Sequence, residues 1–382
     1  MKKPLLIENV IQTRRWLHEH PELSYQEFAT TRYLQEWLKE MQLKLQPFNS
    51  VDTGGFVDVG RGAGPLFGFR ADIDALPIEE NDAHRIKSGN RGVMHACGHD
   101  FHTALGLGLA QYFSTNPDEI RGRLRILFQP AEETIPDGAS KIHKEPLFDQ
   151  MIGLFAIHVD LRFQPGQIAI KEGTACASST LLKIRLKGPG GHTSRPHETV
   201  DLIRITALYI SELNGYLKSL IDSRHDFTLV FGSIHGGNLH NVIPSEILLS
   251  GTLRNFDNHV LKILLDGIKD FSHKFATLYK FTVEVDIPNS TPAIVNNTTM
   301  YAQLLSFAET NGYSDRIVKM GQPSMGADDF AYYSRVVPSL YFQIGAGGSG
   351  SSHSSDFQLS DELLEPALDF LIGYVKYVLN SF

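Results

Sequence analysis

Cysteine is scarce in this sequence: the 382 residues include only Cys97 and Cys176. So few cysteines exclude a small disulfide-stapled extracellular scaffold, and the chain can fold in a reducing compartment. The first eight residues contain two lysines and a very short apolar run, which does not match a secretory signal peptide. We therefore expect a cytoplasmic protein.

Long hydrophobic runs and a large excess of positive charge are also missing. Hydrophobic residues make up 42% of the chain and charged residues 20%, and no stretch is long enough to span a membrane. The formal net charge of −8 gives no reason to expect nucleic acid or an anionic membrane as a partner. The length instead predicts a globular protein of two domains.

Metal-binding residue types are concentrated in one short segment, 94–102. It holds three histidines, one of the two cysteines and an aspartate around a single glycine. Thiolate, imidazole and carboxylate groups bind borderline divalent metals such as zinc, so this density indicates part of a metal centre. Cys97 and His99 directly precede an apolar run at 103–112, which predicts a helix with the metal at its N-terminal end. Taken alone, Cys97 could equally be a small buried hydrophobic residue.

Four short apolar strands predicted from the sequence each lead into further candidate ligands. In open α/β sheets, sites form beyond the carboxyl ends of strands, so we expect these four groups to meet at one edge of a mixed sheet flanked by helices. The strands and the residues that follow them are 66–69 before Asp72 and Asp74, 124–128 before Glu132 and Glu133, 152–157 before His158, and 340–344 before the glycine-serine loop 345–355, which contains His353.

Glu132 and Glu133 are adjacent carboxylates that follow a strand and a proline. On an irregular turn, neighbouring side chains point in different directions, so one could bind a metal while the other takes a proton from a metal-activated water. This arrangement suits hydrolysis. An isolated Glu-Glu pair is more often a solvated acidic turn, and a lone histidine such as His158 or His353 is often an ordinary core or exposed residue.

A different pattern between residues 180 and 288 predicts a second domain inserted into the first. The order β-α-β-β-α-β is the ferredoxin-like arrangement. The catalytic domain would therefore consist of residues 1–179 and 289–382. The expected elements of the inserted domain are strands at 181–186, 227–233, 246–254 and 281–287, with helices at 199–221 and 259–279, and those of the catalytic domain include helices ending before Pro21, at 25–41 and at 362–379.

In combination and in order, these segments resemble the metal-dependent N-acyl-amino-acid amidohydrolases, an aminoacylase- and carboxypeptidase-related family. Its nearest branch contains hippurate hydrolases, auxin-conjugate hydrolases and N-acetyldiaminopimelate deacetylases. The resemblance runs nearly end to end and is carried by the motifs at 14–22, 69–77, 94–100, 128–133, 190–192, 241–244 and 251–254.

The resemblance implies a catalytic domain that holds two divalent metal ions, which could be zinc, manganese, nickel or cobalt. Glu132 would be the general base and acid, while Asp72 and Asp74 would hold ligands or a substrate-side loop from behind. The implied metal ligands are Cys97, as the bridging ligand, His99, Glu133, His158 and His353.

The resemblance also implies roles for the inserted domain. His192 would donate a hydrogen bond to the oxyanion, and dimeric relatives supply this histidine from the partner subunit, so a homodimer through the inserted domain is implied. Asn241 and Arg254 would contact the substrate, because an arginine fork can bind both oxygens of a carboxylate. Without the resemblance, Asn241 could simply cap a loop and Arg254 could be a surface residue.

The implied function is hydrolysis of the linear amide bond of a small-molecule N-acyl amino acid. One alternative is a dipeptidase or exopeptidase with the same chemistry, which would need a site for a free α-amine. Another is a non-catalytic binding protein that retains the fold, against which the intact Glu132–Glu133 pair argues. Phe101 and Asp328 depart from the family pattern, and we expect them to cause a local adjustment in the substrate pocket or among the residues that support the site.

Overall fold

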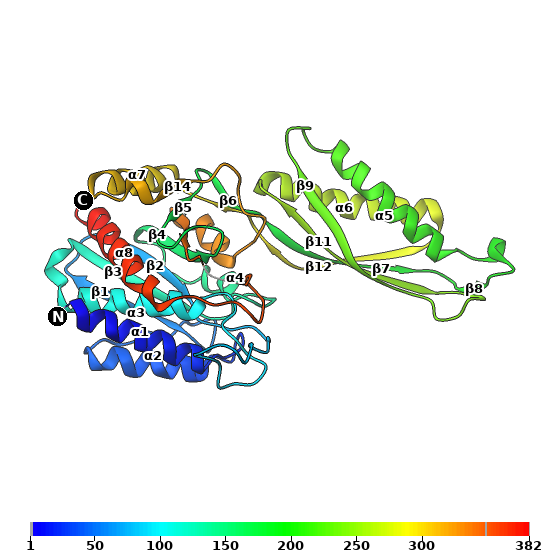
Figure 1. Ribbon diagram of the computed structural model, residues 1–382. Coiled ribbons are helices and arrows are strands. Elements are labelled where there is room, and N and C mark those ends of the chain that lie inside the picture. The colour runs from blue at the N-terminus through cyan, green and yellow to red at the C-terminus, as the bar shows by residue number, and fades with distance from the viewer. Residues whose placement is uncertain (1–2, 348–349, 382) are drawn as a thin grey trace. The chain divides into compact units, whose positions relative to one another are not determined.

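The computed structural model describes residues 3–347 and 350–381 (Figure 1). Residues 1–2, part of the segment inspected for a signal peptide, and residues 348–349, part of the glycine-serine loop, lie outside the described residues. The chain divides into two compact units. The first unit consists of Met1–Ala175, Val295–Gln322 and Asp329–Phe382, and the second of Cys176–Ile294 and Pro323–Asp328. The interval 180–288 taken from the sequence falls inside the second unit, which also includes the short segment Pro323–Asp328.

A seven-stranded sheet forms the centre of the first unit, in the order β1-β3-β2-β4-β15-β5-β14. The four strands β3, β2, β4 and β15 are parallel to one another, whereas β1 pairs antiparallel with β3 and β5 pairs antiparallel with β15. The predicted mixed sheet is therefore confirmed, and its four central strands end at the same edge. Their bounds are β1 (Gly55–Arg61), β2 (Leu66–Asp72), β3 (Gly122–Gln129), β4 (Met151–Asp160), β5 (Ile168–Ile170), β14 (Ile317–Lys319) and β15 (Ser339–Gly345).

Helices cover this sheet and complete the core of the first unit. α3 packs against β2 and also contacts α8, and α1 packs on α3 (Figure 1). α3 approaches the sheet closely because Gly106 has no side chain: a Cβ there would lie 2.9 Å from the Phe128 ring. The helices are α1 (Lys3–Glu19), α2 (Phe28–Glu40), α3 (His99–Thr115), α4 (Ala139–Ile142), α7 (Thr298–Thr310) and α8 (Leu364–Leu379), with 3-10 turns η1 (Pro117–Glu119), η3 (Ser314–Arg316), η4 (Asp329–Arg335) and η5 (Asp361–Leu363).

Several helices begin at residues other than those predicted, and α2 and α3 show the physical reason or the consequence. α2 begins at Phe28 and not at Tyr25, because Tyr25 has a left-handed φ of 64° and the Glu22 carboxylate accepts the N–H groups of Ala29 and Thr30. α3 begins four residues earlier than the predicted run, at His99, so it includes this candidate ligand in its first turn.

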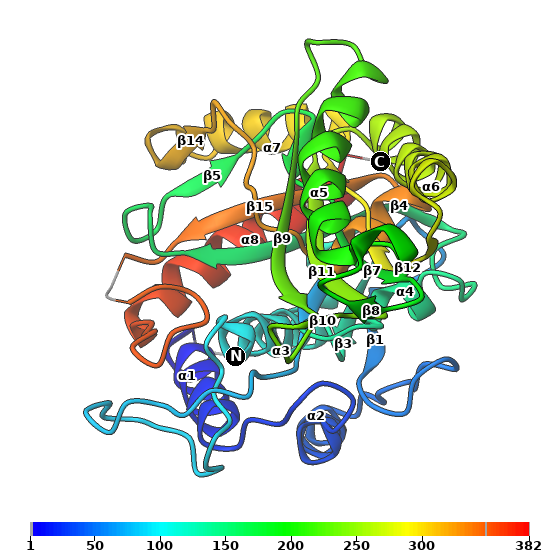
Figure 2. The same ribbon diagram turned by 90° about the vertical axis from the view of Figure 1, so that its right-hand side faces the viewer.

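The second unit is a four-stranded antiparallel sheet, β12-β7-β11-β9, packed against α5 and α6 (Figure 2). Alternate residues of β7, namely Leu182, Ile184 and Leu186, are buried against Tyr209 of α5 and its neighbours. The predicted ferredoxin-like order is confirmed. The bounds are β7 (Ser179–Lys187), α5 (Leu202–Ser219), β9 (Phe227–His235), β11 (Glu246–Asn255), α6 (Asn258–Tyr279) and β12 (Thr282–Thr291), with η2 (Pro196–Glu198) and the short pair β8 (Gly191–His192) with β10 (Val242–Ile243). A further short pair, β6 (Thr174–Cys176) with β13 (Ile294–Val295), contains the positions at which the chain enters and leaves the second unit.

Across residues 3–347 and 350–381, none of the helices combines the length and the apolar character that a membrane crossing requires.

Candidate metal and active site

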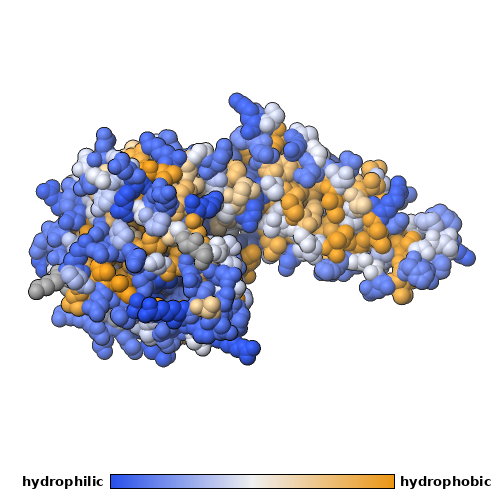
Figure 3. All heavy atoms as spheres, in the orientation of Figure 1, coloured by the Kyte–Doolittle hydropathy of each residue, from blue (hydrophilic) through white to orange (hydrophobic). Residues whose placement is uncertain are grey.

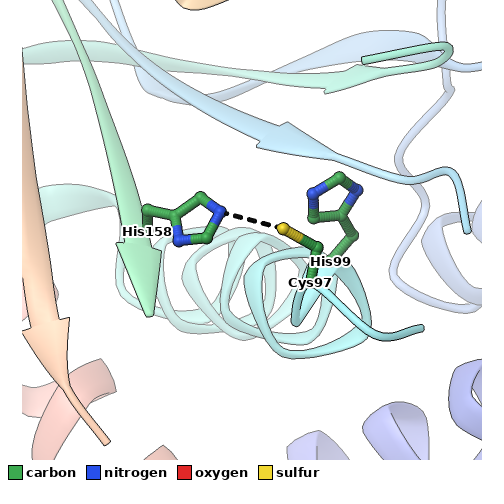
Figure 4. A group of neighbouring side chains, drawn as sticks. All are labelled: Cys97, His99 and His158. Atoms are coloured by element: carbon green, nitrogen blue, oxygen red, sulfur yellow. Dashed lines mark hydrogen bonds between the residues drawn. The ribbon is translucent and has the colours of Figure 1, made fainter. Parts of the chain in front are cut away.

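The five predicted metal ligands come together in the first unit, around the Cys97 sulfur. Cys97 Sγ lies 3.3 Å from His158 Nε2 and 3.3 Å from His353 Nε2. Glu133 Oε1 lies 3.1 Å from His353 Nε2 and 3.8 Å from His99 Nε2. Figure 4 shows His158 on β4 facing Cys97, with His99 at the start of α3 beside them. Donors from four separated chain segments thus surround one small volume.

Gly98 allows both of its neighbours to face this volume. Its φ is +85°, a left-handed backbone conformation that residues other than glycine rarely adopt. A Cβ at this position would lie 2.5 Å from Val159 Cγ2, so the site has no room for one. The reversal at Gly98 places Cys97 just before α3 and His99 within its first turn.

Backbone carbonyls orient the histidine rings. His99 Nδ1 lies 2.9 Å from the Asp74 carbonyl oxygen, and His158 Nδ1 lies 2.7 Å from the Val159 carbonyl oxygen. Because a carbonyl only accepts, each Nδ1 carries its proton, and each Nε2 is the atom directed to the site. The structure shows that His158 lies within β4, which continues to Asp160, whereas the sequence predicted a strand ending before it. His353 has a left-handed φ of 65° and donates its N–H to the carbonyl of Ala96.

Asp72 and Asp74 lie behind the ligands and are almost completely buried. Asp74 Oδ2 accepts the Glu133 N–H at 2.9 Å and the Ser24 hydroxyl at 2.6 Å. Asp72 Oδ1 is 2.7 Å from His102 Nδ1, and His102 Nε2 accepts the N–H of Val159. Both ring nitrogens of His102 are therefore engaged inside the protein, which suits a structural role.

The surroundings of the ligands are strongly acidic. Although burial disfavours a charged imidazole, the carboxylates of Asp72, Asp74 and Glu133 raise the pKa of His99 to about 10. Burial, together with Glu133 and Glu132, raises the pKa of the Cys97 thiol. The site therefore stabilises positive charge and disfavours the thiolate form of Cys97. A bound cation would supply that positive charge and would lower the pKa of the Cys97 thiol.

Two buried atoms support the fit of a metal ion to this donor set. Within the described part of the chain, His99 Nε2 and Glu133 Oε1 have no hydrogen bond of good geometry, although Glu133 Oε1 lies within ion-pair distance of His353 Nε2. Buried polar atoms normally have partners, so these two indicate donors kept for a ligand. Sulfur, imidazole and carboxylate are the donors that zinc and neighbouring divalent metals accept. The residues present fit the implied metal ions.

Glu132 stands at the edge of this cluster, with Oε2 4.0 Å from His99 Nε2 and a side chain that is 12% exposed. It follows Ala131, a non-glycine residue with a left-handed φ of 57°. The turn that carries the two glutamates is therefore irregular, as the sequence led us to expect.

The structure also contains supporting residues that sequence reasoning missed. Arg70 is completely enclosed and contacts Asp72, Gln129 Oε1 at 2.8 Å and Asp329 Oδ1 at 2.6 Å. An arginine inside an otherwise apolar strand was a signal for such a network. Glu27, which is fully buried beside Ala131, had no comparable signal.

The second unit brings His192 and Asn241 together. β8 and β10 pair His192 with Val242, and the Thr193 N–H binds the carbonyl of Asn241 at 3.1 Å. His192 Nδ1 accepts the Ser194 N–H at 3.1 Å. Arg254, near the end of β11, donates to the Met325 carbonyl at 2.7 Å.

The two positions that depart from the family pattern are both buried. Phe101 is fully enclosed and belongs to the hydrophobic core of the first unit. Asp328 is 5% exposed. We therefore expect Phe101 to affect the site through the packing of α3 in the core, and not as part of an exposed pocket wall.

Comparisons with known proteins found one matching family profile and several similar proteins. The sequence profile of Peptidase family M20/M25/M40 matches residues 68–377. The chain is 32% identical over 377 residues to N-acetyl-L-cysteine deacetylase of Bacillus subtilis, covering 98% of this chain and 89% of that protein. It is 33% identical over 364 residues to thermostable carboxypeptidase 2 of Saccharolobus solfataricus, covering 93% and 92%. A Bacillus subtilis protein, described as a dinuclear metal binding peptidase from the M20 family, has a similar structure, with a TM-score of 0.85, 30% identity and coverage of 100% of both chains.

Proposed function

Because the chain belongs to peptidase family M20/M25/M40, a family of metallohydrolases, we propose that it hydrolyses the amide bond of small N-acyl amino acids. The observation that carries this proposal is the placement of Glu132 beside the cluster of Cys97, His99, Glu133, His158 and His353. A carboxylate next to a set of metal-binding donors is the arrangement that metal-assisted hydrolysis needs. Relatives at about this level of identity include deacetylases of N-acetyl-cysteine and N-acetyldiaminopimelate.

The five clustered donors, Cys97 included, would hold two divalent cations. When bound, such cations would polarise the amide carbonyl and lower the pKa of water. His99 and His158 would present Nε2, because their Nδ1 protons are engaged by backbone carbonyls. Asp74 would keep Glu133 and His99 in place, since it contacts both.

Glu132 is the proposed general base and acid. It would take a proton from the attacking water and return it to the leaving nitrogen, which departs as an amine. Its partial exposure supports this role, because a group that exchanges protons with substrate must be reachable. Asp72 and Asp74, by contrast, are buried and engaged by neighbouring histidines, which suits supporting roles.

His192 is the proposed donor to the developing oxyanion. Its Nδ1 accepts the Ser194 backbone N–H, so the ring proton resides on Nε2, and that nitrogen is a donor. Arg254 would bind the substrate carboxylate and Asn241 its amide or acyl group. These roles require residues of the second unit to reach substrate held by the first, from the same chain or from a partner subunit.

We also propose a homodimer formed through the second unit. Eight large apolar side chains among the described residues of this unit are exposed, and Figure 3 shows hydrophobic residues on the visible surface of the second unit. Exposed apolar surface of this kind is typical of protein interfaces. The residues are Ile203, Leu220, Val230, Ile234, Leu239, Val242, Leu278 and Met325. Two free, buried cysteines are compatible with the proposed cytoplasmic location.

A substrate panel tests the proposed reaction. Purified protein loaded with defined zinc, manganese, nickel or cobalt is assayed on N-acetyl amino acids, N-benzoyl amino acids and unblocked dipeptides. Faster turnover of the N-acylated compounds supports the proposal. Absence of turnover on every N-acyl compound with every metal would refute it.

The second candidate is a carboxypeptidase or dipeptidase, favoured by the 33% identity to thermostable carboxypeptidase 2. The same panel separates the two, because only this candidate predicts a higher kcat/KM for peptides with a free α-amine. A non-catalytic binding protein predicts no turnover of either class.

A further inference from the structure

The turn that carries Glu132 and Glu133 does not hold its shape by local preference. Ala131 has a φ of 57°, and a non-glycine residue keeps such a conformation only when its surroundings enforce it. The contacts of Ala131 therefore decide where the next two side chains point.

Glu27, at the start of α2, supplies one of these contacts. Its Oε1 accepts the Ala131 N–H at 2.8 Å, and its Oε2 accepts the Thr53 hydroxyl at 2.7 Å. On the other side, the Gly138 N–H binds the Ala131 carbonyl at 2.7 Å. Both backbone polar groups of Ala131 are thus occupied, and of its two partners Glu27 is the one with an ionisable side chain.

The position of Glu27 is costly to maintain. Its side chain is fully buried, and within the described ranges no cationic side chain lies within ion-pair distance of it. Burial and the nearby Asp74 carboxylate raise the pKa of Glu27 to about 7. A buried acid without a cation destabilises a fold, so its presence beside an active-site turn points to a role other than stability.

We propose that Glu27 is a positioning residue that fixes the backbone of Ala131 and so directs Glu132 and Glu133 into the site. Glu27 has no contact with the proposed ligands and acts through the turn alone. The kinetic part of this inference rests on the proposed function, whereas its effect on metal binding through Glu133 does not depend on which substrate is used.

Three variants test the proposal. E27A removes the contact with Ala131. E27Q keeps it, because the amide oxygen can accept the Ala131 N–H while the amide nitrogen donates to Thr53. E145A is the matched control: Glu145 is also a buried acid that holds backbone, accepting the N–H groups of Asn49 and Ser50 at 2.9–3.1 Å, but it serves another loop.

We expect E27A to lower kcat by about tenfold or more with a smaller change in KM, since a small misplacement of catalytic groups slows chemistry strongly. It should also weaken metal binding, measured by titration of the metal-free protein with zinc. E27Q should keep kcat and zinc affinity near those of the wild type. E145A should lower the melting temperature while leaving kcat and zinc affinity near those of the wild type.

Wild-type kcat and zinc affinity in E27A, or equal losses in E27A and E145A, would overturn the proposal. If E27A does not fold, T53V replaces it: loss of the hydroxyl that holds Glu27 should lower kcat in the same direction, and an unchanged kcat would contradict the inference. If the wild-type protein turns over no N-acyl amino acid, the proposed function fails, but the zinc titrations still decide the role of Glu27.

Discussion

The buried cluster of His18, Asp100 and Glu80 predicts that the stability of the first unit depends on pH. His18 Nδ1 lies 3.0 Å from Asp100 Oδ2, and His18 Nε2 lies 2.9 Å from Glu80 Oε1. Although burial opposes the charge, these two carboxylates raise the pKa of His18 from its ordinary 6.5 to about 9. The same Asp100 oxygen also contacts Arg14, and Asp100 follows His99 in the first turn of α3. Protonated His18 therefore helps to hold the helix end that carries a proposed ligand.

The sign and size of the effect follow from linkage. A group whose pKa is higher in the folded state stabilises the fold fully below its unfolded pKa, and that stabilisation disappears as the pH rises through the folded pKa. For His18 the window runs from about 6.5 to about 9. The difference between these values corresponds to about 3 kcal/mol of unfolding free energy.

Urea unfolding followed by tryptophan fluorescence measures this quantity in the right place. The chain has two tryptophans, Trp16 in α1 and Trp37 in α2, so the signal reports the first unit. We expect the stability difference between wild type and H18N to shrink by about 3 kcal/mol between pH 6 and pH 10. H143N is the control, because His143 hydrogen-bonds a backbone carbonyl and lies in no ion pair of the described residues. A wild-type minus H18N difference that stays constant with pH would refute the argument.

Three further outcomes are expected. Glu132→Gln should lower kcat by about 10²–10⁴-fold, because the carboxylate acts as the general base. Its metal content, measured by atomic emission, should stay that of the wild type, because Glu132 is not a proposed ligand. Activity equal to that of the wild type would exclude the mechanism. Gly98→Ala should greatly weaken zinc binding, since its φ of +85° and the 2.5 Å approach to Val159 force the backbone between two ligands to move; unchanged affinity would show that the turn can adapt. Arg254→Lys should raise KM for an N-acetyl amino acid, with little change for its methyl ester, because lysine cannot form the bidentate contact; parallel changes for acid and ester would argue against carboxylate binding.

Local patterns in the sequence were sufficient for most of the architecture. The apolar residues of the segments that form β7, α5 and α6 predict the ferredoxin-like order, because strand and helix periods are local properties of the sequence. The density of ligand types at 94–102 and the polar residues after the strands supplied the candidates, and the resemblance to the amidohydrolase family implied which five of them are ligands; these five meet around Cys97. The ends of elements were less predictable, as α2 shows, since its first residue depends on a carboxylate outside the helix.

The supporting structure of the site could not be predicted in this way. Glu27 and Ala131 are 104 residues apart, and His18 and Asp100 are 82 apart, so no local pattern links them. A carboxylate in an amphipathic helix looks the same in sequence whether it faces water or a buried N–H.

The sequence by itself determined which chemical groups the protein carries and at which strand ends they lie. Tertiary structure alone decided which nitrogen of each histidine faces the site, and which buried acids hold the turn of Glu132 and Glu133. The physical reason is that proton placement and buried charge depend on the partners within hydrogen-bond distance, and folding brings those partners from distant parts of the chain.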